Sequence, residues 1–394
     1  MAEVAAVVRR RTEMTRNCPV CDSDRHQLIR QQDFSDGQFQ ELVSCGDCGM
    51  VFARISPKVD YGTGSMYAMG GAGGSGETPM ERQRLWETVR IIENVPVAKQ
   101  ATILDVGCAR GGMLEALTTA GYLNVMGMDP SAGCVAACHR KGLRAVQGTL
   151  EDEFKWKFDL VILSHVLEHV WDVPASLKQV HRLLKPGGLY YIEVPDAEQY
   201  VANVTVPFLE INREHVNHFS RKTLGNALRM AGLARGEVLG GTRDIRLVTG
   251  CHPAIFAIGR EAEKKSTTLD ILPDFDLIDK MRSYISMSEK ELEAINMRLI
   301  GLWPKGAEIA IWGYGELAQQ LLRIEAVRRA RVVQVVDSDP GKIGRQVNDE
   351  GLVVEYPNML RPGIPVLIAS VMAREGIYKA GVSMGLKDRM VAIL

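Results

Sequence analysis

The stretch Ile103-Leu104-Asp105-Val106-Gly107-Cys108-Ala109-Arg110-Gly111-Gly112 decides the fold. An apolar run ends beside a carboxylate and passes directly into small residues, a pattern typical of a β-strand that turns into a helix. Small residues let the backbone of such a turn approach a ligand closely. An acid at the end of the strand favours a ligand that carries positive charge. We therefore predict a ligand-binding turn that contains Asp105, Gly107 and Gly111.

The sequence around this turn alternates between strand-like and helix-like segments. Apolar strand-like runs lie at 101–106, 123–128, 143–147, 158–163 and 189–194. Helical stretches are expected near 113–120, 131–141 and 173–184. Strands separated by helices of this length form a mostly parallel sheet that is covered on both faces, so the predicted fold class is α/β with a doubly wound sheet. A helix at 221–231, with Ser220 as its N-cap, and two further strand-like segments that end near Ile258 extend the unit.

Four of the eight cysteines form two pairs, Cys18-Pro-Val-Cys21 and Cys45-Gly-Asp-Cys48. A secreted disulfide scaffold is shorter and richer in cysteine, whereas paired Cys-x-x-Cys units are typical of a tetrahedral Zn²⁺ site. Four thiolate ligands close the coordination shell, so the predicted zinc is structural. The alternative is four thiols without a metal. His26 is a rival ligand.

The glycine run at 70–76 has two interpretations. It is either a flexible linker or a loop that orders over a bound substrate. A charged, irregular stretch at 259–276 marks a boundary, and apolar residues then recur at three- and four-residue steps along a long helix, apart from Ser288.

A second alternating unit begins at 308–312. Gly313-Tyr314-Gly315-Glu316-Leu317-Ala318 follows that strand, and a later strand ends at Asp337, which matches the pattern of a dinucleotide-binding turn. The alternative is that these glycines only allow close packing of strand and helix. The predicted domains are a zinc-binding module with its connector (1–75), a central domain (76–260), and a helical linker with a Rossmann-like domain (261–394).

Composition excludes several classes of function. The 47 Lys and Arg balance 48 Asp and Glu, and residues 1–60 carry eight basic against nine acidic residues. Nucleic-acid binding needs an excess of cationic side chains, so it is not expected. No apolar run reaches the roughly 18 residues of a membrane span. In the N-terminal stretch the arginines follow the apolar residues, the reverse of a signal peptide, so we expect a cytoplasmic protein.

The central unit resembles class I methyltransferases that use S-adenosylmethionine. Asp105, Gly107 and Gly111 match their first motif, in which Ala109 replaces the middle glycine. The resemblance implies that Asp129 binds the ribose hydroxyls and that an acid of 148–152, for which we select Asp152, lies at the adenine. It also implies that Ser164 and His165 border the methionine end of the cofactor. Leu184-Lys185-Pro186-Gly187-Gly188 closes the series of motifs.

A base that activates the methyl acceptor is expected in Arg213-Glu214-His215-Val216-Asn217-His218-Phe219-Ser220. The segment follows the fifth strand, where substrate-facing insertions fall in open α/β sheets. A histidine with a nearby carboxylate titrates near neutral pH, so His215 is the predicted base and Glu214 its partner or a substrate contact. The alternative for His215 is a surface histidine. Rivals for the role of base are His165, His169 and His218, whereas His181 is expected to be structural.

The whole chain resembles the three-domain, zinc-containing sugar C-methyltransferases that act on nucleotide-linked keto-deoxysugars. In that family Glu-His-x-x-x-Phe-Ser carries the catalytic histidine, and Glu214, His215, Phe219 and Ser220 match it. The family's aromatic residues are missing before Glu214 and across 70–76, where only Tyr61 and Tyr67 lie nearby.

The resemblance implies methyl transfer from S-adenosylmethionine to a nucleotide-activated keto-sugar, at carbon, through an enolate that His215 generates. The alternatives are an O-methyltransferase of a sugar or small metabolite, and a non-catalytic assembly protein that binds S-adenosylmethionine or NAD. A monomer or homodimer is expected, with a role in deoxysugar biosynthesis.

Overall fold

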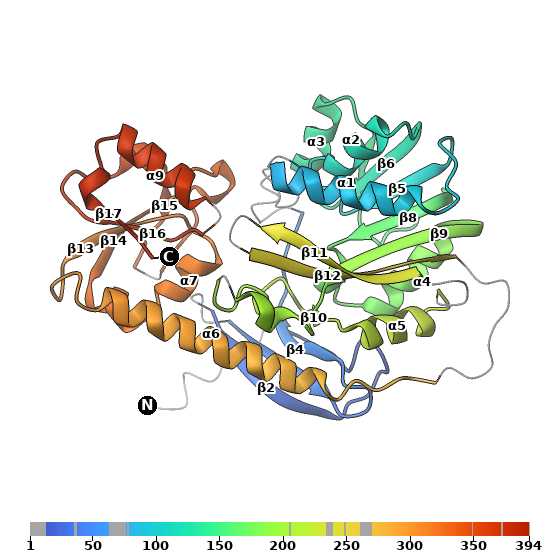
Figure 1. Cartoon of the computed structure of the whole chain (residues 1–394), viewed down its shortest axis with the longest axis horizontal. Coiled ribbons are helices and arrows are strands. Elements are labelled where there is room, and N and C mark those ends of the chain that lie inside the picture. The colour runs from blue at the N-terminus through green and yellow to red at the C-terminus, as the bar shows by residue number, and fades with distance from the viewer. Residues whose placement is uncertain are drawn as a thin grey trace. The chain divides into compact units, whose positions relative to one another are not determined.

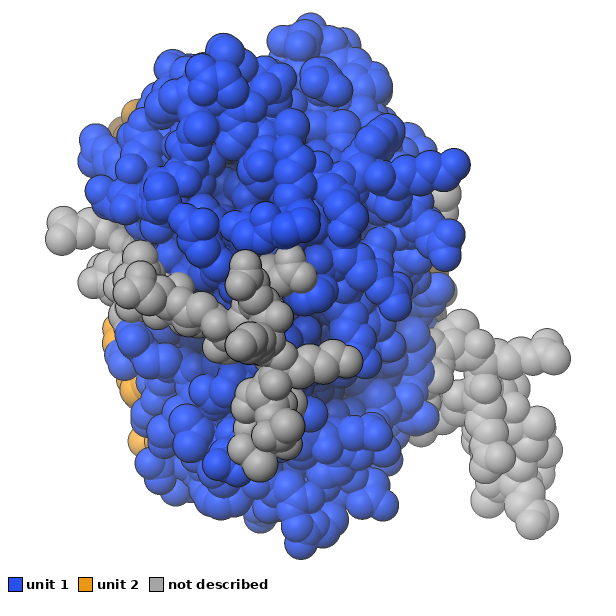
Figure 2. Space-filling view, turned by 90° about the vertical axis from the view of Figure 1, so that its right-hand side faces the viewer, with its two compact units in different colours: residues 1–199, 213–245, 252–280 blue, residues 200–212, 246–251, 281–394 orange. Residues whose placement is uncertain are grey.

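The computed structural model describes residues 13–34, 38–62, 76, 79–204, 206–233, 239–247, 250–260, 270–348, 350–371 and 373–393. The glycine run at 70–76 therefore lies outside the described residues, apart from Gly76. The chain divides into two compact units, which Figure 2 distinguishes by colour. Unit 1 comprises residues 1–199, 213–245 and 252–280, and unit 2 comprises residues 200–212, 246–251 and 281–394. The predicted domain boundaries stay predictions.

Unit 1 begins with a small antiparallel sheet that contains the paired cysteines. Its strands are β1 (Glu13–Thr15), β2 (His26–Asp33), β3 (Phe39–Cys45) and β4 (Val51–Pro57), in the order β1-β4-β3-β2. A short strand from much later in the chain, β10 (Asn217–His218), pairs with β4. The segment predicted to carry the base is thus joined to this N-terminal sheet.

The rest of unit 1 is built on a seven-stranded sheet with the order β11-β12-β9-β8-β5-β6-β7 (Figure 1). The strands are β5 (Thr102–Val106), β6 (Asn124–Asp129), β7 (Ala145–Gln147), β8 (Phe158–Ser164), β9 (Leu184–Pro195), β11 (Leu239–Leu247) and β12 (Gly250–Arg260). Strands β5 to β9 pair in parallel, and β12 pairs with β9 in antiparallel. Chain order reverses between β5 and β8, and open α/β sheets bind ligands at such a switch point, beyond the carboxyl ends of the strands.

Helices cover both faces of this sheet, as predicted (Figure 1). They are α1 (Pro79–Glu93), α2 (Gly112–Thr119), α3 (Ala132–Arg140), α4 (Val173–Leu183) and α5 (Arg221–Met230). Side chains alternate between the faces of a strand. Ile103 accordingly packs in the core that includes residues of α1 and α2, and its neighbour Leu104 packs in the core that includes residues of α4 and α5. The predicted α/β fold class is confirmed.

Unit 2 holds a five-stranded parallel sheet with the order β15-β14-β13-β16-β17. The strands are β13 (Glu308–Trp312), β14 (Arg331–Val336), β15 (Val354–Glu355), β16 (Val366–Ile368) and β17 (Met390–Ala392). The helices are α7 (Glu316–Leu321), α8 (Glu325–Arg329) and α9 (Arg374–Ser383), together with all but the first turn of α6 (Leu277–Leu299).

The excursion 200–212 explains the polar position in the apolar stripe of α6. Ser288 is fully buried, and its hydroxyl accepts the backbone N–H of Phe208 at 3.1 Å. One turn away, the hydroxyl of Tyr284 accepts the N–H of Glu210 at 3.0 Å. A serine in the stripe is therefore a hydrogen-bond partner for a buried loop. Among the described residues no helix is both long enough and apolar enough to cross a bilayer.

Candidate active site

The turn after β5 has the backbone geometry that its glycines allow. Gly107 and Gly111 adopt φ of 70° and 84°, in the left-handed region. A Cβ at Gly107 would lie 2.7 Å from Cγ2 of Val166, and one at Gly111 would lie 2.5 Å from Cδ1 of Leu143. Ala109, which replaces the middle glycine, also has a left-handed φ of 47°. That conformation costs an L-residue about 1–2 kcal/mol. The backbone of the turn is nevertheless left-handed at this position, with alanine in place of glycine.

Asp129, at the end of β6, holds this turn in place. One carboxylate oxygen accepts the N–H of Ala109 at 2.9 Å, and the other accepts the N–H of Ser131 at 2.8 Å. Ser131 in turn caps α3 by accepting the N–H of Cys134. An ionised carboxylate offers about four lone-pair sites, so each oxygen of Asp129 keeps capacity for a further donor such as a ribose hydroxyl.

Asp105, at the end of β5, is buried beneath the same turn. Burial raises the pKa of its carboxyl to about 8; the nearby charge of Arg84 opposes the rise, and that of Asp129 adds to it. A carboxyl that is costly to ionise alone gains from a cation placed beside it. The position therefore fits a positively charged methyl donor.

Asp152 lies in the loop that follows β7 and is exposed. Its Oδ2 accepts the N–H of Thr149 at 2.7 Å and lies 3.3 Å from the Thr149 hydroxyl. The carboxylate thus shapes its own turn, and its predicted place at the adenine stays a prediction.

A buried polar network follows β8. Arg84 of α1 donates to the hydroxyl of Ser164 at 2.9 Å and lies 3.5 Å from Glu193. The Ser164 hydroxyl donates to Glu193 at 3.1 Å, and the hydroxyl of Tyr191 donates to the other Glu193 oxygen at 2.6 Å. A fully buried carboxylate is therefore held by an arginine and two hydroxyls.

His165 extends this network with strained backbone, at φ 56°. Its ring lies 3.2 Å from a carboxylate oxygen of Glu168 and 3.4 Å from one of Glu193. Burial alone would lower the pKa of His165, but the two carboxylates outweigh burial and raise it. Strain of this kind persists where the surroundings impose it, often at functional sites.

The short turn η3 (Leu167–His169) supplies a second histidine and an acid beside His215. The rings of His169 and His215 meet edge to face with centroids 5.0 Å apart, and the hydroxyl of Tyr61 lies 3.3 Å from Nδ1 of His169. Ligand atoms of Glu168, His169 and His215 lie within 4.8 Å of one another. Burial alone would raise the pKa of Glu168, but the three histidines His165, His169 and His215 lower it to about 2, so this carboxylate is ionised.

The predicted base segment is bound tightly to η3. Nδ1 of His169 lies 3.0 Å from the carbonyl of Glu214, and the N–H of Val216 donates to the carbonyl of Glu168 at 2.9 Å. The amide of Asn217 donates to the carbonyls of Leu167 and Val170. These bonds fix His215 at the carboxyl edge of the sheet.

Arg16, from the N-terminal sheet, also holds this segment. Its guanidinium donates to the carbonyls of Ala53, Trp171 and Val216 and to the side-chain oxygen of Asn217. It also stacks over the ring of Trp171, 4.3 Å from the centroid. Burial lowers the pKa of Arg16 to about 9, and the charges of Cys18 and Asp172 oppose this.

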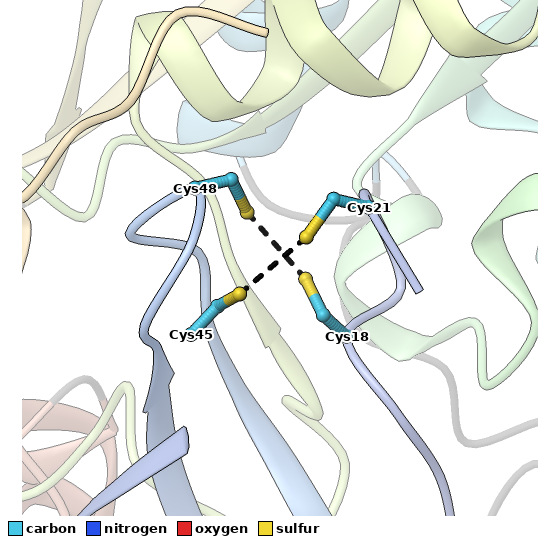
Figure 3. A group of neighbouring side chains, drawn as sticks. All are labelled: Cys18, Cys21, Cys45 and Cys48. Atoms are coloured by element: carbon cyan, nitrogen blue, oxygen red, sulfur yellow. Dashed lines mark hydrogen bonds between the residues drawn. The ribbon is translucent and has the colours of Figure 1, made fainter. Parts of the chain in front are cut away.

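The four paired cysteines converge on one point, as Figure 3 shows. The sulfur atoms of Cys18 and Cys48 lie 3.5 Å apart, as do those of Cys21 and Cys45. A tetrahedral zinc with bonds of about 2.3 Å needs sulfur atoms roughly 3.8 Å apart, so the cluster is compatible with zinc after a small expansion.

Sequence reasoning placed several of these residues and missed others. The structure brings Asp105, Gly107, Gly111 and Asp129 together, and the loop after β8 carries Ser164 and His165. The acid shown near His215 is Glu168, whereas the described bond of Glu214 uses its backbone carbonyl. His218 is fully buried in the β10–β4 pair.

The missed residues include Glu168, Glu193, Arg84 and Arg16. Glu193 had a signal in the sequence, because it is a lone acid inside the apolar strand β9. Arg84 and Arg16 had none, since their partners are distant in the chain.

The dinucleotide-like turn of unit 2 repeats the arrangement at Asp129. One oxygen of Asp337 accepts the N–H of Tyr314 at 2.7 Å, and the other accepts the N–H of Asp339 at 2.9 Å. Lys342 adds an ion pair to Asp337 at 2.9 Å. The carboxylate that would meet a ribose is thus paired with an ammonium group of its own unit.

Comparisons with known proteins find methyltransferases that match part of the chain. A family model described as a methyltransferase domain matches residues 81–235. Over 100 residues the chain is 36% identical to a ubiquinone biosynthesis O-methyltransferase from Bradyrhizobium sp. (strain ORS 278), which covers 23% of this chain and 38% of that protein. Over 171 residues it is 29% identical to the mitochondrial arginine-hydroxylase NDUFAF5 of Danio rerio, covering 41% of this chain and 52% of that protein.

Solved structures of methyltransferases also resemble this part. One is a SAM-dependent methyltransferase from Archaeoglobus fulgidus, with 18% identity, a TM-score of 0.37, and coverage of 45% of this chain and 94% of that chain. The chain spans between about a third and a half of the length of the curated relatives named above. Residues 81–235 thus match the model of a methyltransferase domain, and part of the chain is similar to methyltransferases.

Proposed function

We propose that the protein transfers a methyl group from S-adenosylmethionine to a carbon atom of a nucleotide-activated keto-sugar. The observation that carries the proposal is the placement of His215. It lies in a segment that matches Glu-His-x-x-x-Phe-Ser, and backbone hydrogen bonds hold that segment against the turn that follows β8. In the sequence, the four cysteines come before this domain and the Rossmann-like unit comes after it. Both support the same family resemblance.

Residues at the carboxyl edge of the sheet would hold the cofactor. Asp129 keeps acceptor capacity for two hydroxyls, and Asp105 would lie near the positive charge of the donor. The left-handed glycines at 107 and 111 leave the turn open to close approach. Ser164 and His165 would border the methionine end, and Asp152 the adenine. When bound, S-adenosylmethionine supplies an electrophilic methyl group on a sulfonium.

His215 would act as the base that activates the acceptor. A carbon next to a keto group becomes a nucleophile when a base removes its proton, and a well-placed base contributes roughly 10²–10⁴-fold. The ionised carboxylate of Glu168 would stabilise the imidazolium that forms. Glu214 would contact the sugar.

The four cysteines would bind one structural Zn²⁺. The converging sulfur atoms and the closed thiolate set support this assignment. We further propose that the protein is a cytoplasmic monomer or homodimer. We expect it to bind no nucleic acid, because its basic and acidic residues balance.

A second candidate is O-methylation, which the relatives named ubiquinone biosynthesis O-methyltransferase favour. A hydroxyl acceptor would use the same base, since His215 can remove an O–H proton as well. The position of the new methyl group separates the two candidates, because product NMR distinguishes a methoxy signal from a C-methyl signal.

Transfer of label from S-[methyl-³H]adenosylmethionine to a panel of nucleotide keto-sugars tests the proposal. We expect label in at least one sugar and a fall of at least 100-fold in kcat for His215→Asn. His181→Asn is the matched control and should keep the wild-type rate. Absence of label from every sugar, in protein that binds the cofactor, would contradict the proposed substrate class.

A further inference from the structure

The Glu168–His169–His215 cluster has the composition of a metal site. Two imidazoles and one carboxylate are a common ligand set for divalent transition metals. One ligand atom from each residue lies within 4.8 Å of the others, although the residues come from η3 and from the segment before β10. The cluster is separate from the four cysteines, which use sulfur ligands only.

Hydrogen bonding fixes the tautomer of His169. The carbonyl of Glu214 can only accept, so Nδ1 of His169 carries the proton in the 3.0 Å bond between them. In the neutral ring Nε2 then carries no proton, and its lone pair can accept a hydrogen bond or bind a cation. Nε2 lies 3.8 Å from the Oε1 atom of Glu168, which is an acceptor as well. Two acceptors that face each other leave room for a cation between them.

One carboxylate oxygen of Glu168 could accept a further ligand. The side chain is 1% exposed, and Oε1 is the oxygen that lies near His165 and His169. Oε2 is buried and has no hydrogen-bond partner among the described residues. A buried carboxylate oxygen without a partner costs free energy unless a proton donor or a cation approaches it.

The surroundings of the cluster are those of a metal site. Ligating histidines usually donate their other ring N–H to a carbonyl or carboxylate, as His169 does to Glu214. The backbone bond from Val216 to Glu168 joins the two ligand-bearing segments next to the cluster. The rings of His165 and Tyr61 also lie beside the cluster, and the charge of Glu214 acts on His169. Three protein ligands would leave further coordination positions for water or a substrate oxygen.

We propose that Glu168, His169 and His215 form a second metal site, which takes one divalent transition-metal cation such as Co²⁺ or Zn²⁺. Binding at this site uses a lone pair of the His215 ring. The cation and the proton-abstracting role of His215 therefore exclude each other, and an occupied site inhibits methyl transfer. The inhibition rests on the proposed function, whereas cation binding does not.

Titration with Co²⁺ alone of the full chain that carries a single equivalent of Zn²⁺, at the four cysteines, tests the binding. We expect one equivalent to bind, with the weak visible bands of nitrogen and oxygen ligands and without the intense thiolate charge-transfer band of a cysteine site. Glu168→Gln keeps the volume and removes the charge, and His169→Gln removes the second ligand. Each should weaken binding at least tenfold, and His181→Gln should leave it unchanged.

The retained zinc content and the circular dichroism spectrum show that each variant is folded. If wild type takes up no Co²⁺, or if folded Glu168→Gln and His169→Gln bind it as wild type does, the cluster holds only protons and the proposed metal site is wrong.

The methyl-transfer assay tests the exclusion. We expect Co²⁺ to inhibit transfer over the concentration range in which it binds. If Co²⁺ binds while transfer continues or increases, the exclusion is wrong and the proposed function stands. If no transfer occurs without added cation, the proposed function fails even when Co²⁺ binds.

Discussion

At the scale of single residues, carboxylates decide what the site can bind. Burial raises the pKa of both Asp129 and Asp105, but two backbone N–H groups oppose the rise at Asp129, whereas Asp105 stays protonated near neutral pH. Glu168 is ionised because histidines surround it. Asp105 and Glu168 thus differ in charge near neutral pH, and only their surroundings make them differ.

Asp105 should make stability depend on pH. Its pKa is about 8 in the fold and 3.8 in the unfolded chain, so the native state binds the extra proton between these values. The contribution of Asp105 to the free energy of unfolding is present below pH 3.8 and is lost as pH rises to 8. We expect urea midpoints of the wild type to fall between pH 5 and pH 8 more steeply than those of Asp105→Asn. Parallel curves for the two proteins would contradict the raised pKa.

The same residue should couple cofactor binding to proton release. A cation beside Asp105 favours its ionised form, so S-adenosylmethionine should displace a proton at pH 7. Calorimetry in buffers of different ionisation enthalpy measures the number released. We expect up to one proton from the wild type and at least half a proton less from Asp105→Asn. Equal proton release from the wild type and Asp105→Asn would show that the positive charge of S-adenosylmethionine does not lie beside Asp105.

At the scale of elements, the segment from Glu214 to Asn217 depends on partners far away in the chain. It bonds to η3, which lies about 45 residues earlier, and to Arg16, which lies about 200 residues earlier. Such bonds leave no local periodicity in the sequence. Reasoning from the sequence therefore found the segment through its motif and did not find the side chains that hold it.

Arg16 should position His215 as well as stabilise the fold. Arg16→Gln removes a partly buried cation from four acceptors, so we expect the free energy of unfolding to fall by about 2–4 kcal/mol. At concentrations of urea where the variant is fully folded, kcat should still fall at least tenfold. Arg16→Lys should recover little, because an ammonium cannot reach all four acceptors.

Arg54→Gln is the matched control for this prediction, since Arg54 also lies in the N-terminal sheet but pairs with Glu41 in a partly exposed position. It should cost no more than about 1 kcal/mol and leave kcat unchanged. A stable Arg16→Gln variant with wild-type kcat would show that the segment does not need this anchor.

How well an element or a contact could be predicted from the sequence depends on how far apart its interacting residues lie along the chain. Between residues 101 and 231, the strand–turn–helix alternation was predicted nearly to the residue, because it depends on local apolar patterning. Strand β9 was an exception: it begins at Leu184 and includes Gly187 and Gly188, which read as a turn. Its pairing with β8 passes from Phe158–Leu184 directly to Leu160–Leu189, so residues 185–188 lie outside the parallel pairing, where the turn signal falls.

At the scale of the whole molecule, the two units share one hydrogen-bonding arrangement between a carboxylate and a turn. A carboxylate at the end of the second strand accepts an N–H from the turn after the first strand, at Asp129 in unit 1 and at Asp337 in unit 2. Only Asp337 is also paired with a lysine. The motif therefore predicts the turn in both units but does not by itself predict a bound nucleotide.

The cysteine cluster should stabilise unit 1, because its sulfur atoms pack in the same core as strands β8 and β9. We expect removal of zinc by a chelator to lower the thermal midpoint of unit 1 by roughly 10 °C or more. Cys48→Ala should lose the metal, whereas Cys134→Ala, a buried cysteine outside the cluster, should retain it. Metal analysis that finds no zinc in folded wild type would contradict the assignment.

The most direct test of the central claim is calorimetric titration of S-adenosylhomocysteine into the full chain and two variants. Asp129→Ala and Asp337→Ala each remove a carboxylate that accepts two backbone N–H groups, and Asp337→Ala also removes the ion pair with Lys342. The account predicts one site in the wild type, an affinity at least tenfold weaker in Asp129→Ala, and no change in Asp337→Ala. No heat of binding to the wild type, or equal affinity in wild type and Asp129→Ala, would contradict it.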